Sequence, residues 1–364
     1  MNRTILLLVL LSIPCISMDA EPLFEIQTAV ASKGPSHWCA YACAARLNDG
    51  RILCVYSDCG DRIAGIFSDD GIFWSEPVSL IDSPVEADYD PNIVVVGDRV
   101  FVLSTTRMSD EIIRTTTWCA RSEDNGKTWS KPYVVVIPHT YTSGKVQPGI
   151  QLKSGRLLFP YSWDLVLEEG SKTVRGEGEM DSQAGVMISD DQGDTWRLGG
   201  DVHVEVKADD KKSGGAIFGA DEPALMELSD GSIYMIMRTG TDRMWETWSR
   251  DGGETWDPPR PSSLVAHNTP ATLCKLEREN VIVCVWNESP TNRWPLVAAV
   301  SKDECRTWSK PKMLACVPGL QSSYPGSAVT RDGLILAFWQ QQRPNERRDI
   351  IMARFNLEWL LAQD

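Results

Sequence analysis

The sequence lacks the short motifs that mark the most common catalytic centres. Its 364 residues contain no glycine-rich phosphate loop, no His-Glu-x-x-His metal motif and no Gly-x-Ser-x-Gly nucleophile turn. Histidine occurs only four times, at positions 37, 139, 203 and 267, without ligand spacing, and no two cysteines have the Cys-x-x-Cys spacing of a zinc site. The motifs therefore predict no metal site and no cofactor.

Positive charge is also scarce. Lysine and arginine number 36 against 50 aspartates and glutamates, which gives a net charge of -14. A surface of this sign repels nucleic acid and anionic membranes, so these two classes of partner are excluded. A site for an anionic substrate has to be locally positive against this background.

Long hydrophobic runs are absent after the first twenty residues. The run from Thr4 to Ile13 follows one positive charge and precedes small residues near Ser17 and Ala20. This layout predicts a secretory signal peptide over residues 1–20, and hence a secreted or periplasmic protein. The run is too short to span about 30 Å of hydrocarbon. A lipoprotein signal at Cys15 is the less favoured alternative, because a proline precedes it.

Ten cysteines are present, nine of them beyond the expected signal peptide. An odd number in an exported chain leaves at least one thiol unpaired. Four lie close together in the sequence and are candidates for bridges, namely Cys39, Cys43, Cys54 and Cys59. Buried free thiols are the favoured interpretation.

Tryptophan is abundant, and its positions are periodic. The pattern Ser-x-Asp-x-Gly-x-Thr-Trp occupies residues 122–129, 189–196, 249–256 and 301–308, with Cys305 replacing glycine in the last copy. A degenerate fifth copy ends at Trp74, where we expect Asp69 and Gly71 to keep the register while Phe67 and Phe73 replace Ser and Thr.

Each copy is typical of a turn between two strands. The aspartate accepts hydrogen bonds from turn amides, the glycine allows a positive φ, and the tryptophan packs its large face against the sheet. Repeats of roughly fifty residues, each with about four strands, indicate the blades of a β-propeller.

The repeats resemble the Asp-box, or bacterial neuraminidase repeat, of the sialidase superfamily. The resemblance covers essentially the whole of residues 21–364 and implies one all-β domain, a six-bladed β-propeller. We expect the last blade to lack a box and the segment from Leu23 to Ala31 to close the ring beside Ile350 to Phe355. The blades are expected at 36–82, 87–140, 145–204, 218–264, 267–316 and 322–356, with polar loops at 168–183 and 207–215.

The same resemblance implies the site residues. Glu222 and Arg238 match the family's buried glutamate and one substrate-binding arginine, Arg293 matches a second arginine, and Tyr324 matches the catalytic tyrosine. Asp90, followed by proline, resembles an aspartate that contacts the substrate ring. The box aspartates face away from the active site in this family and receive no catalytic role.

The chemistry explains this combination of residue types. A sialic acid carries a carboxylate on its anomeric carbon, so a neutral tyrosine is a better nucleophile than a carboxylate, provided that a glutamate takes its proton. Arginines recognise the carboxylate through forked donors, and an aspartic acid protonates the leaving oxygen.

The first blade departs from the family pattern. At the position of the family's first arginine, the chain has Ala40 or Tyr41, and the second arginine is missing as well. Asp58 or Asp61 is expected to stand for the acid, with Asp58 favoured by its order in the chain. Arg62 is a partial replacement for a missing arginine. Where the family often has Tyr-Glu, the last blade has Trp-Gln at 339–340.

These residues predict a retaining glycosidase that acts on terminal sialic acid or a related acidic sugar of extracellular glycans, as a monomer. Because the arginine set is altered, two alternatives stay open. One is a glycosidase or lyase acting on another, uronate-bearing polysaccharide. The other is a non-catalytic glycan-binding propeller. His267, at the start of the fifth blade, is a weaker candidate for substrate contact.

Overall fold

The computed structural model describes residues 20–84, 88–109, 113–144, 146–165, 180–206 and 217–362. The expected signal peptide and most of the two expected polar loops lie outside these ranges. In the described part, no helix is long and apolar enough to cross a membrane.

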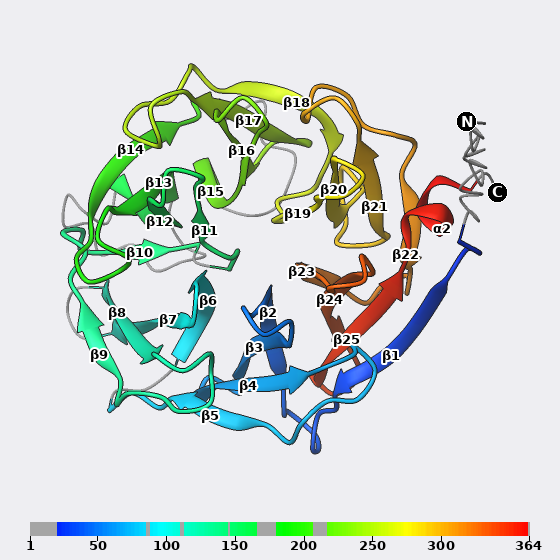
Figure 1. The fold of residues 1–364 in the computed structure, drawn as a ribbon, viewed down its shortest axis with the longest axis horizontal. Helices are drawn as coiled ribbons and strands as arrows, with labels where there is room; N and C mark the ends of the chain where they lie inside the picture. Colours follow the sequence, from blue (N-terminus) through cyan, green and yellow to red (C-terminus); the bar gives the residue numbers. More distant parts are fainter. Residues whose placement is uncertain are drawn as a thin grey trace, which may run out of the picture.

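The fold is a β-propeller (Figure 1). Four sheets have four strands each. They comprise β2 (Cys39–Arg46), β3 (Ile52–Asp58), β4 (Arg62–Ser68) and β5 (Val78–Ile81); β6 (Asp88–Val96), β7 (Arg99–Ser109), β8 (Ile113–Ser122) and β9 (Tyr133–Val135); β19 (Thr272–Leu276), β20 (Val281–Asn287), β21 (Leu296–Ser301) and β22 (Lys312–Ala315); and β23 (Ser322–Val329), β24 (Ile335–Gln342) and β25 (Arg348–Phe355) with β1 (Phe24–Val30).

The remaining strands form one nine-stranded sheet made of two antiparallel units. The first unit contains β10 (Thr142–Ser143), β11 (Ile150–Gln151), β12 (Leu157–Asp164), β13 (Met180–Ser189) and β14 (Arg197–His203); the second contains β15 (Ile217–Glu227), β16 (Ile233–Thr239), β17 (Arg243–Ser249) and β18 (Arg260–Val265). A short parallel pairing between β13 and β15 joins them. Counted separately, these units correspond to the third and fourth expected blades.

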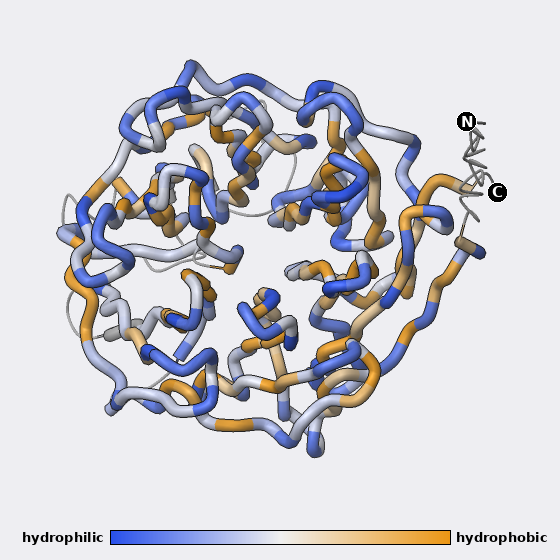
Figure 2. The backbone as a smooth tube through the Cα atoms, viewed as in Figure 1, coloured by the Kyte–Doolittle hydropathy of each residue, from blue (hydrophilic) through white to orange (hydrophobic). Residues whose placement is uncertain are grey.

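The hydrophobic core lies between the blades. The described residues form six clusters, each shared by two neighbouring blades, including one shared by the last blade and the first. In Figure 2 the hydrophobic stretches lie mainly along the strands of the blades, and the hydrophilic stretches lie mainly in the turns and loops that connect them. Each box tryptophan packs against one of these clusters: Trp74, Trp129, Trp196, Trp256 and Trp308.

The last blade lacks a box and closes the ring in a different way. As expected, β1 pairs antiparallel with β25, from Phe24 opposite Phe355 to Val30 opposite Ile350. The short helix α2 (Leu357–Leu361) then brings Trp359 against the one cluster that has no box tryptophan. Its ring stacks on Phe24 with centroids 4.2 Å apart. The helix therefore supplies the tryptophan that the missing box does not.

The boxes form the expected turns. In the copy at 189–196, Asp191 accepts hydrogen bonds from the Thr195 amide (2.8 Å) and hydroxyl (2.5 Å), and the Gly193 amide donates to Ser189 Oγ (2.8 Å). These bonds lower the pKa of Asp191 to about 2. The side chain closes the turn, so its role is structural.

The register expected for the degenerate box is wrong. Asp70, rather than Asp69, accepts the amides of Ile72 and Phe73, at 2.8 and 2.9 Å. Ser68, rather than Phe67, accepts the Gly71 amide at 2.8 Å. The turn is one residue shorter than in the other copies. Counting back from the tryptophan therefore misplaced both polar residues by one position.

The candidate disulfides are absent among the described residues. All nine described cysteines are free thiols, and seven of them are buried. Burial raises the pKa of Cys43 to about 12, so this thiol stays protonated and unreactive. Cys59 is half-buried, and Cys316 is exposed.

Candidate active site

The site is built on irregularities in the innermost strands of the blades, which meet around the central axis (Figure 1). Four of these strands contain a break in pairing register, at Tyr41, Asp90, Glu222 and Tyr324. All four residues have a positive φ, between 47 and 59°. Such a conformation is uncommon for residues other than glycine. Bulges of this kind often re-aim a side chain next to an active site.

The other two blades carry a residue with positive φ as well. Asn268, just before β19, has a φ of 43°, and Gly144, just after β10, has a φ of 69°. Each blade therefore contributes one left-handed residue at a corresponding place. The pattern was partly visible in the sequence, since Asp90, Glu222 and Tyr324 each precede a proline.

Glu222 and Arg238 form a buried ion pair. Arg238 Nη1 donates to Glu222 Oε2 at 2.7 Å, and both side chains are about 5% exposed or less. Burial raises the pKa of Glu222 above its usual range, although Arg238 and then Arg293 oppose this shift. The result is a glutamate that accepts a proton more readily than an exposed one.

Tyr324 lies beside this pair. Arg238 Nη1 also donates to Tyr324 Oη, at 3.5 Å. The guanidinium of Arg293 lies over the tyrosine ring, 5.2 Å from its centroid. The structure thus brings together all four residues that the resemblance assigned to the core of the site. Arg238 stands between the tyrosine and the glutamate, so the hydrogen bonds that link these two described residues run through the guanidinium.

Asn268 is a residue of this candidate site that the sequence interpretation missed. Its Oδ1 accepts Arg238 Nε and its backbone carbonyl accepts Arg293 Nη2, each at 2.7 Å. One residue therefore holds both arginines. The sequence feature that could have indicated Asn268 is its position at the start of a blade, where only the neighbouring His267 was predicted to contact the substrate. His267 lies at the edge of this group, and burial lowers the pKa of its imidazole.

Tyr41 is one of the two residues, with Ala40, at the position where the resemblance implies an arginine. Its ring meets the edge of Tyr324, with centroids 4.7 Å apart, and also contacts Tyr89, which in turn stacks on Trp38. Its amide donates to Gln340 Oε1 at 3.4 Å. The wall of the site on the first two blades is therefore aromatic, at a place where the resemblance implied an arginine.

Asp58 lies at the end of β3, with Arg62 at the start of β4. Arg62 donates to Asp58 Oδ2 through Nε at 3.2 Å and Nη2 at 3.0 Å. His37 Nε2 lies 3.2 Å from the other oxygen. Arg62 is therefore engaged by Asp58 and does not contact the Arg238 group in the described contacts. Asp61 is exposed on the turn, where its amide donates a hydrogen bond to the backbone carbonyl of Asp58.

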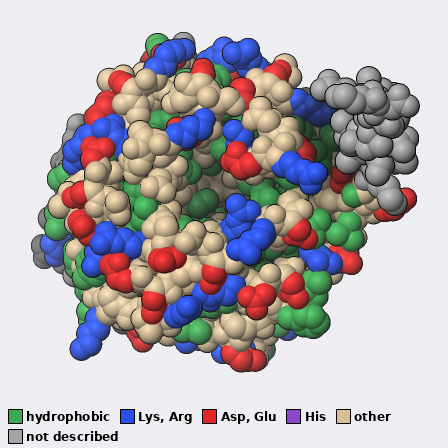
Figure 3. Space-filling model, viewed as in Figure 1, with side chains coloured by type: hydrophobic (Ala, Val, Ile, Leu, Met, Phe, Trp, Pro, Cys, Tyr) green, Lys and Arg blue, Asp and Glu red, His purple; other side chains and the backbone are tan. Residues whose placement is uncertain are grey.

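The site lies at the end of the propeller opposite the boxes. β4 begins at Arg62 beside Asp58 and ends at Ser68 in the first box turn. Asp90 is half-buried at the same end as Asp58, because the amide of the nearby Asp88 bonds to Gly60 on the β3–β4 turn. Figure 3 shows one end of the molecule, hollowed near its centre, with acidic and basic side chains mixed around the hollow.

The fold and this cluster define a β-propeller of the sialidase type. A family model described as "BNR repeat-like domain" matches residues 99–336. The chain belongs to this BNR-repeat family, as the Asp-boxes predicted.

Two curated relatives are named sialidases. The chain is 33% identical to the anhydrosialidase of Macrobdella decora over 187 residues, and 26% identical to the sialidase of Micromonospora viridifaciens over 257 residues. These matches cover 49% and 66% of this chain but only 20% and 35% of the relatives. The chain therefore spans a minor part of the length of these proteins.

Solved structures show the same fold at low identity. An intramolecular trans-sialidase from Ruminococcus gnavus matches with a TM-score of 0.70 and 15% identity, over 93% of this chain and 99% of that one. The sialidase of Trypanosoma rangeli matches with a TM-score of 0.69 and 16% identity, over 91% and 59%. A protein of unknown function from Dyadobacter fermentans matches equally well, with a TM-score of 0.70.

Proposed function

We propose that the protein is a sialidase-type glycoside hydrolase that removes terminal sialic acid, or a related acidic sugar, from extracellular glycans. The observation that carries the proposal is the convergence of Glu222, Arg238, Arg293 and Tyr324 from three blades. The proposal includes export through the N-terminal signal and action as a monomer.

In the proposed mechanism, Tyr324 Oη attacks the anomeric carbon and its proton passes to Glu222. The bond to the leaving oxygen breaks as Asp58 protonates that oxygen. In the second step, water attacks the anomeric carbon and gives a proton to the Asp58 carboxylate, while the bond to Tyr324 Oη breaks and Glu222 returns its proton to that oxygen. The two displacements together give retention of configuration. Since Arg238 separates the two oxygens, the proton transfer requires a small approach of Tyr324 to Glu222, or a bridging water.

The arginines are suited to one anionic group. Arg238 donates hydrogen bonds from Nη1 to Glu222 and from Nε to Asn268, and Arg293 donates from Nη2 to Asn268. The second hydrogen of Arg238 Nη1 is directed at Tyr324, so these bonds leave the donors of Arg238 Nη2, Arg293 Nε and Nη1, and one hydrogen of Arg293 Nη2. They favour a carboxylate on the substrate, although the arginine expected on the first blade is missing.

The test is turnover of a panel of fluorogenic glycosides, in which sialosides, uronides and neutral sugars are compared under the same conditions. We expect turnover of a sialoside or another acidic sugar. Turnover of uronides alone supports the uronate alternative. If no glycoside is turned over while sugars still bind, the glycan-binding alternative replaces the proposal; the aromatic wall of Tyr41, Tyr89 and Trp38 favours that alternative.

A further inference from the structure

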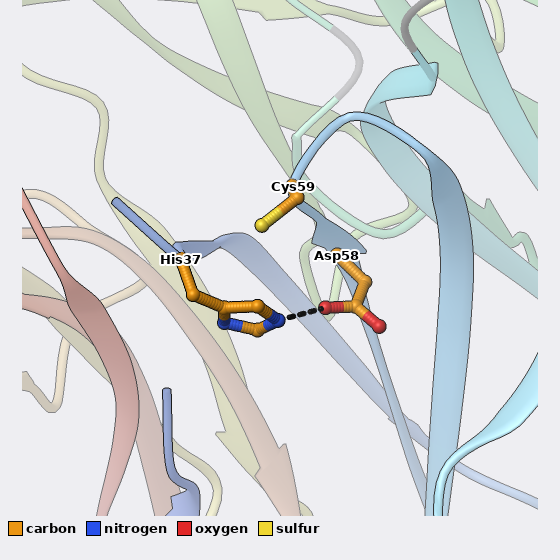
Figure 4. Close-up of side chains that lie close together, drawn as sticks. All are labelled: His37, Asp58 and Cys59. Atoms are coloured by element: carbon orange, nitrogen blue, oxygen red, sulfur yellow. Dashed lines mark ion pairs between the residues drawn. The ribbon is translucent and has the colours of Figure 1, made fainter. Parts of the chain in front are cut away.

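Three side chains outside the Glu222 and Tyr324 group converge near the start of the first blade (Figure 4). They are His37, Asp58 and Cys59, and their donor atoms Nε2, Oδ1 and Sγ all lie within 4.8 Å of one another. We propose that these residues bind a divalent transition-metal ion, with Zn²⁺ as the ion whose chemistry fits best.

The spacing of the donors suits such an ion. His37 Nε2 and Asp58 Oδ1 are 3.2 Å apart. Two ligands of a tetrahedral zinc ion, with bonds of about 2.0–2.1 Å, are separated by roughly 3.3 Å. A sulfur bonded at about 2.3 Å then lies roughly 3.6 Å from a ligand nitrogen. The sulfur lies within 4.8 Å of the other two donors, so it has to move closer by roughly 1 Å at most to complete the group.

The backbone holds the three residues together without an ion. Cys39 pairs with Asp58 across β2 and β3, which brings His37 beside the β3–β4 turn. The Cys59 amide donates to the Trp38 carbonyl at 2.9 Å. Cys59 itself has a φ of 58°, in the left-handed region. Because the fold fixes this geometry, little conformational entropy is lost when an ion binds.

Neighbouring groups orient two of the ligands. Arg62 binds Asp58 through Oδ2 and leaves Oδ1 directed at the imidazole. The Trp38 amide donates to Cys59 Sγ at 3.2 Å, which restricts the position of the sulfur. Such outer partners are typical of metal sites, because they fix the ligand orientation.

The donor set indicates the kind of ion. One nitrogen, one oxygen and one sulfur suit a borderline ion such as Zn²⁺, whereas Ca²⁺ and Mg²⁺ prefer oxygen alone. Three protein ligands leave one position open. The His37 side chain is 20% exposed, so solvent can reach the group. The separation of position 37 from positions 58 and 59 conceals this arrangement in the sequence.

The test is a cobalt titration of the mature chain after removal of metals with a chelator. We expect one equivalent of Co²⁺ to bind with a sulfur-to-cobalt charge-transfer band, and Zn²⁺ to displace it. Cys59→Ser should abolish the band, and His37→Gln should weaken Co²⁺ binding by at least about tenfold. The matched controls Cys316→Ser and His267→Gln should behave as the wild type.

The proposal is overturned if the wild-type chain gives no charge-transfer band. It is equally overturned if the band persists in Cys59→Ser or disappears in Cys316→Ser. Circular dichroism of each variant checks that the fold is retained, and His37→Gln tests the site independently of the cysteine. The titration needs no substrate, so failure of the proposed glycosidase activity does not affect its outcome.

A second measurement links the ion to the proposed mechanism. An ion bound to Asp58 Oδ1 competes with the proton that this residue is proposed to donate. Zn²⁺ should therefore lower the turnover of an accepted glycoside by the wild type but not by Cys59→Ser. Equal loss in both proteins would place the inhibition elsewhere and remove Asp58 from the metal site.

Discussion

At the scale of single residues, the site depends on side chains held in sparsely populated backbone conformations. Glu222 and Tyr324 both have a positive φ in a bulged strand. Strain of this kind costs of order 1–3 kcal/mol per residue and persists only where the surroundings determine it. Here, Arg238 and Arg293 are fixed by the two acceptors of Asn268. The arginines then hold the glutamate and the tyrosine in place.

Removing the Tyr324 hydroxyl should abolish most glycosidase activity. Tyr324→Phe keeps the ring contacts with Tyr41 and Arg293 but loses the proposed nucleophile, so kcat should fall by orders of magnitude with little change in thermal midpoint. Glu222→Gln should lower kcat by about a hundredfold or more, because the proton acceptor is lost. The measurement is kcat on an accepted glycoside. Wild-type turnover by Tyr324→Phe would eliminate the tyrosine mechanism.

The missing arginine predicts weak recognition of a sialic-acid carboxylate. A dehydrated sialic acid, which resembles the transition state, should inhibit the wild type weakly. Tyr41→Arg introduces a guanidinium at the corresponding place and should lower the inhibition constant by about tenfold, the gain of one charge-assisted hydrogen bond. Tight inhibition of the wild type would show that another cation completes the group.

Asp88 gives a prediction for pH dependence. The carboxyl is 1% exposed, and burial raises its pKa to about 6. The folded state therefore binds more protons than the unfolded state between about pH 4 and 6. Stability should fall through this window as pH rises, by at most about 3 kcal/mol. Asp88→Asn should lack this decrease in urea unfolding. A stability difference from wild type that stays constant between pH 4 and 8 would contradict the assignment.

At the scale of elements, the box turn serves as a connector with its own internal hydrogen bonds. It also joins neighbouring blades: Arg156, beside β12, donates to Gly252 and Glu254 in the next box, and Arg51 donates to the carbonyl of Asn125. Since each box tryptophan fills the space between two blades, the repeat sets both the turn and the distance between sheets.

The degenerate box offers a matched pair of variants. Asp70→Ala removes the acceptor for the Ile72 and Phe73 amides and should cost about 1 kcal/mol, as for a lost helix cap. Asp69→Ala, one residue earlier, should leave the thermal midpoint almost unchanged. A larger effect at Asp69 would restore the register counted from the tryptophan.

The effect at Asp70 should also depend on pH. The amides of Phe73 and Ile72 lower the pKa of this carboxyl. Its contribution to stability is therefore present above about pH 4, the usual range in the unfolded chain, and is lost as pH falls through the lower pKa of the folded state. Thermal melts between pH 7 and 2 should show the wild type and Asp70→Ala converging in acid.

At the scale of the whole molecule, the ring is closed by the two ends of the chain. β1 covers the edge of β25, and α2 places Trp359 against Phe24 and Phe355. Without this closure, the edge of β25 is unpaired, and the hydrophobic cluster between the first and last blades loses its contacts with β1. The stability of all blades therefore depends on residues that are far from the site.

Phe24→Ala should test this closure. The substitution removes the stack on Trp359 and should lower the free energy of unfolding by about 2–3 kcal/mol, somewhat less than for a fully buried phenylalanine. Ile26→Ala is the matched control in the same strand, because its side chain is 50% exposed and should cost less than about 0.5 kcal/mol. Equal effects of the two substitutions would contradict the role assigned to Phe24.

The sequence by itself determined the repeat, and through the repeat the propeller. This was possible because a box is a local structure: its aspartate, glycine and tryptophan act within eight residues. The four central residues were predicted separately, from the order and spacing of the family resemblance. The tertiary structure decided what depends on residues far apart in the chain. It placed Asn268 between two arginines, put Trp359 in the place of a missing box tryptophan, and brought His37 to Asp58 and Cys59. These contacts join segments that are far apart in the chain, so no local pattern encodes them.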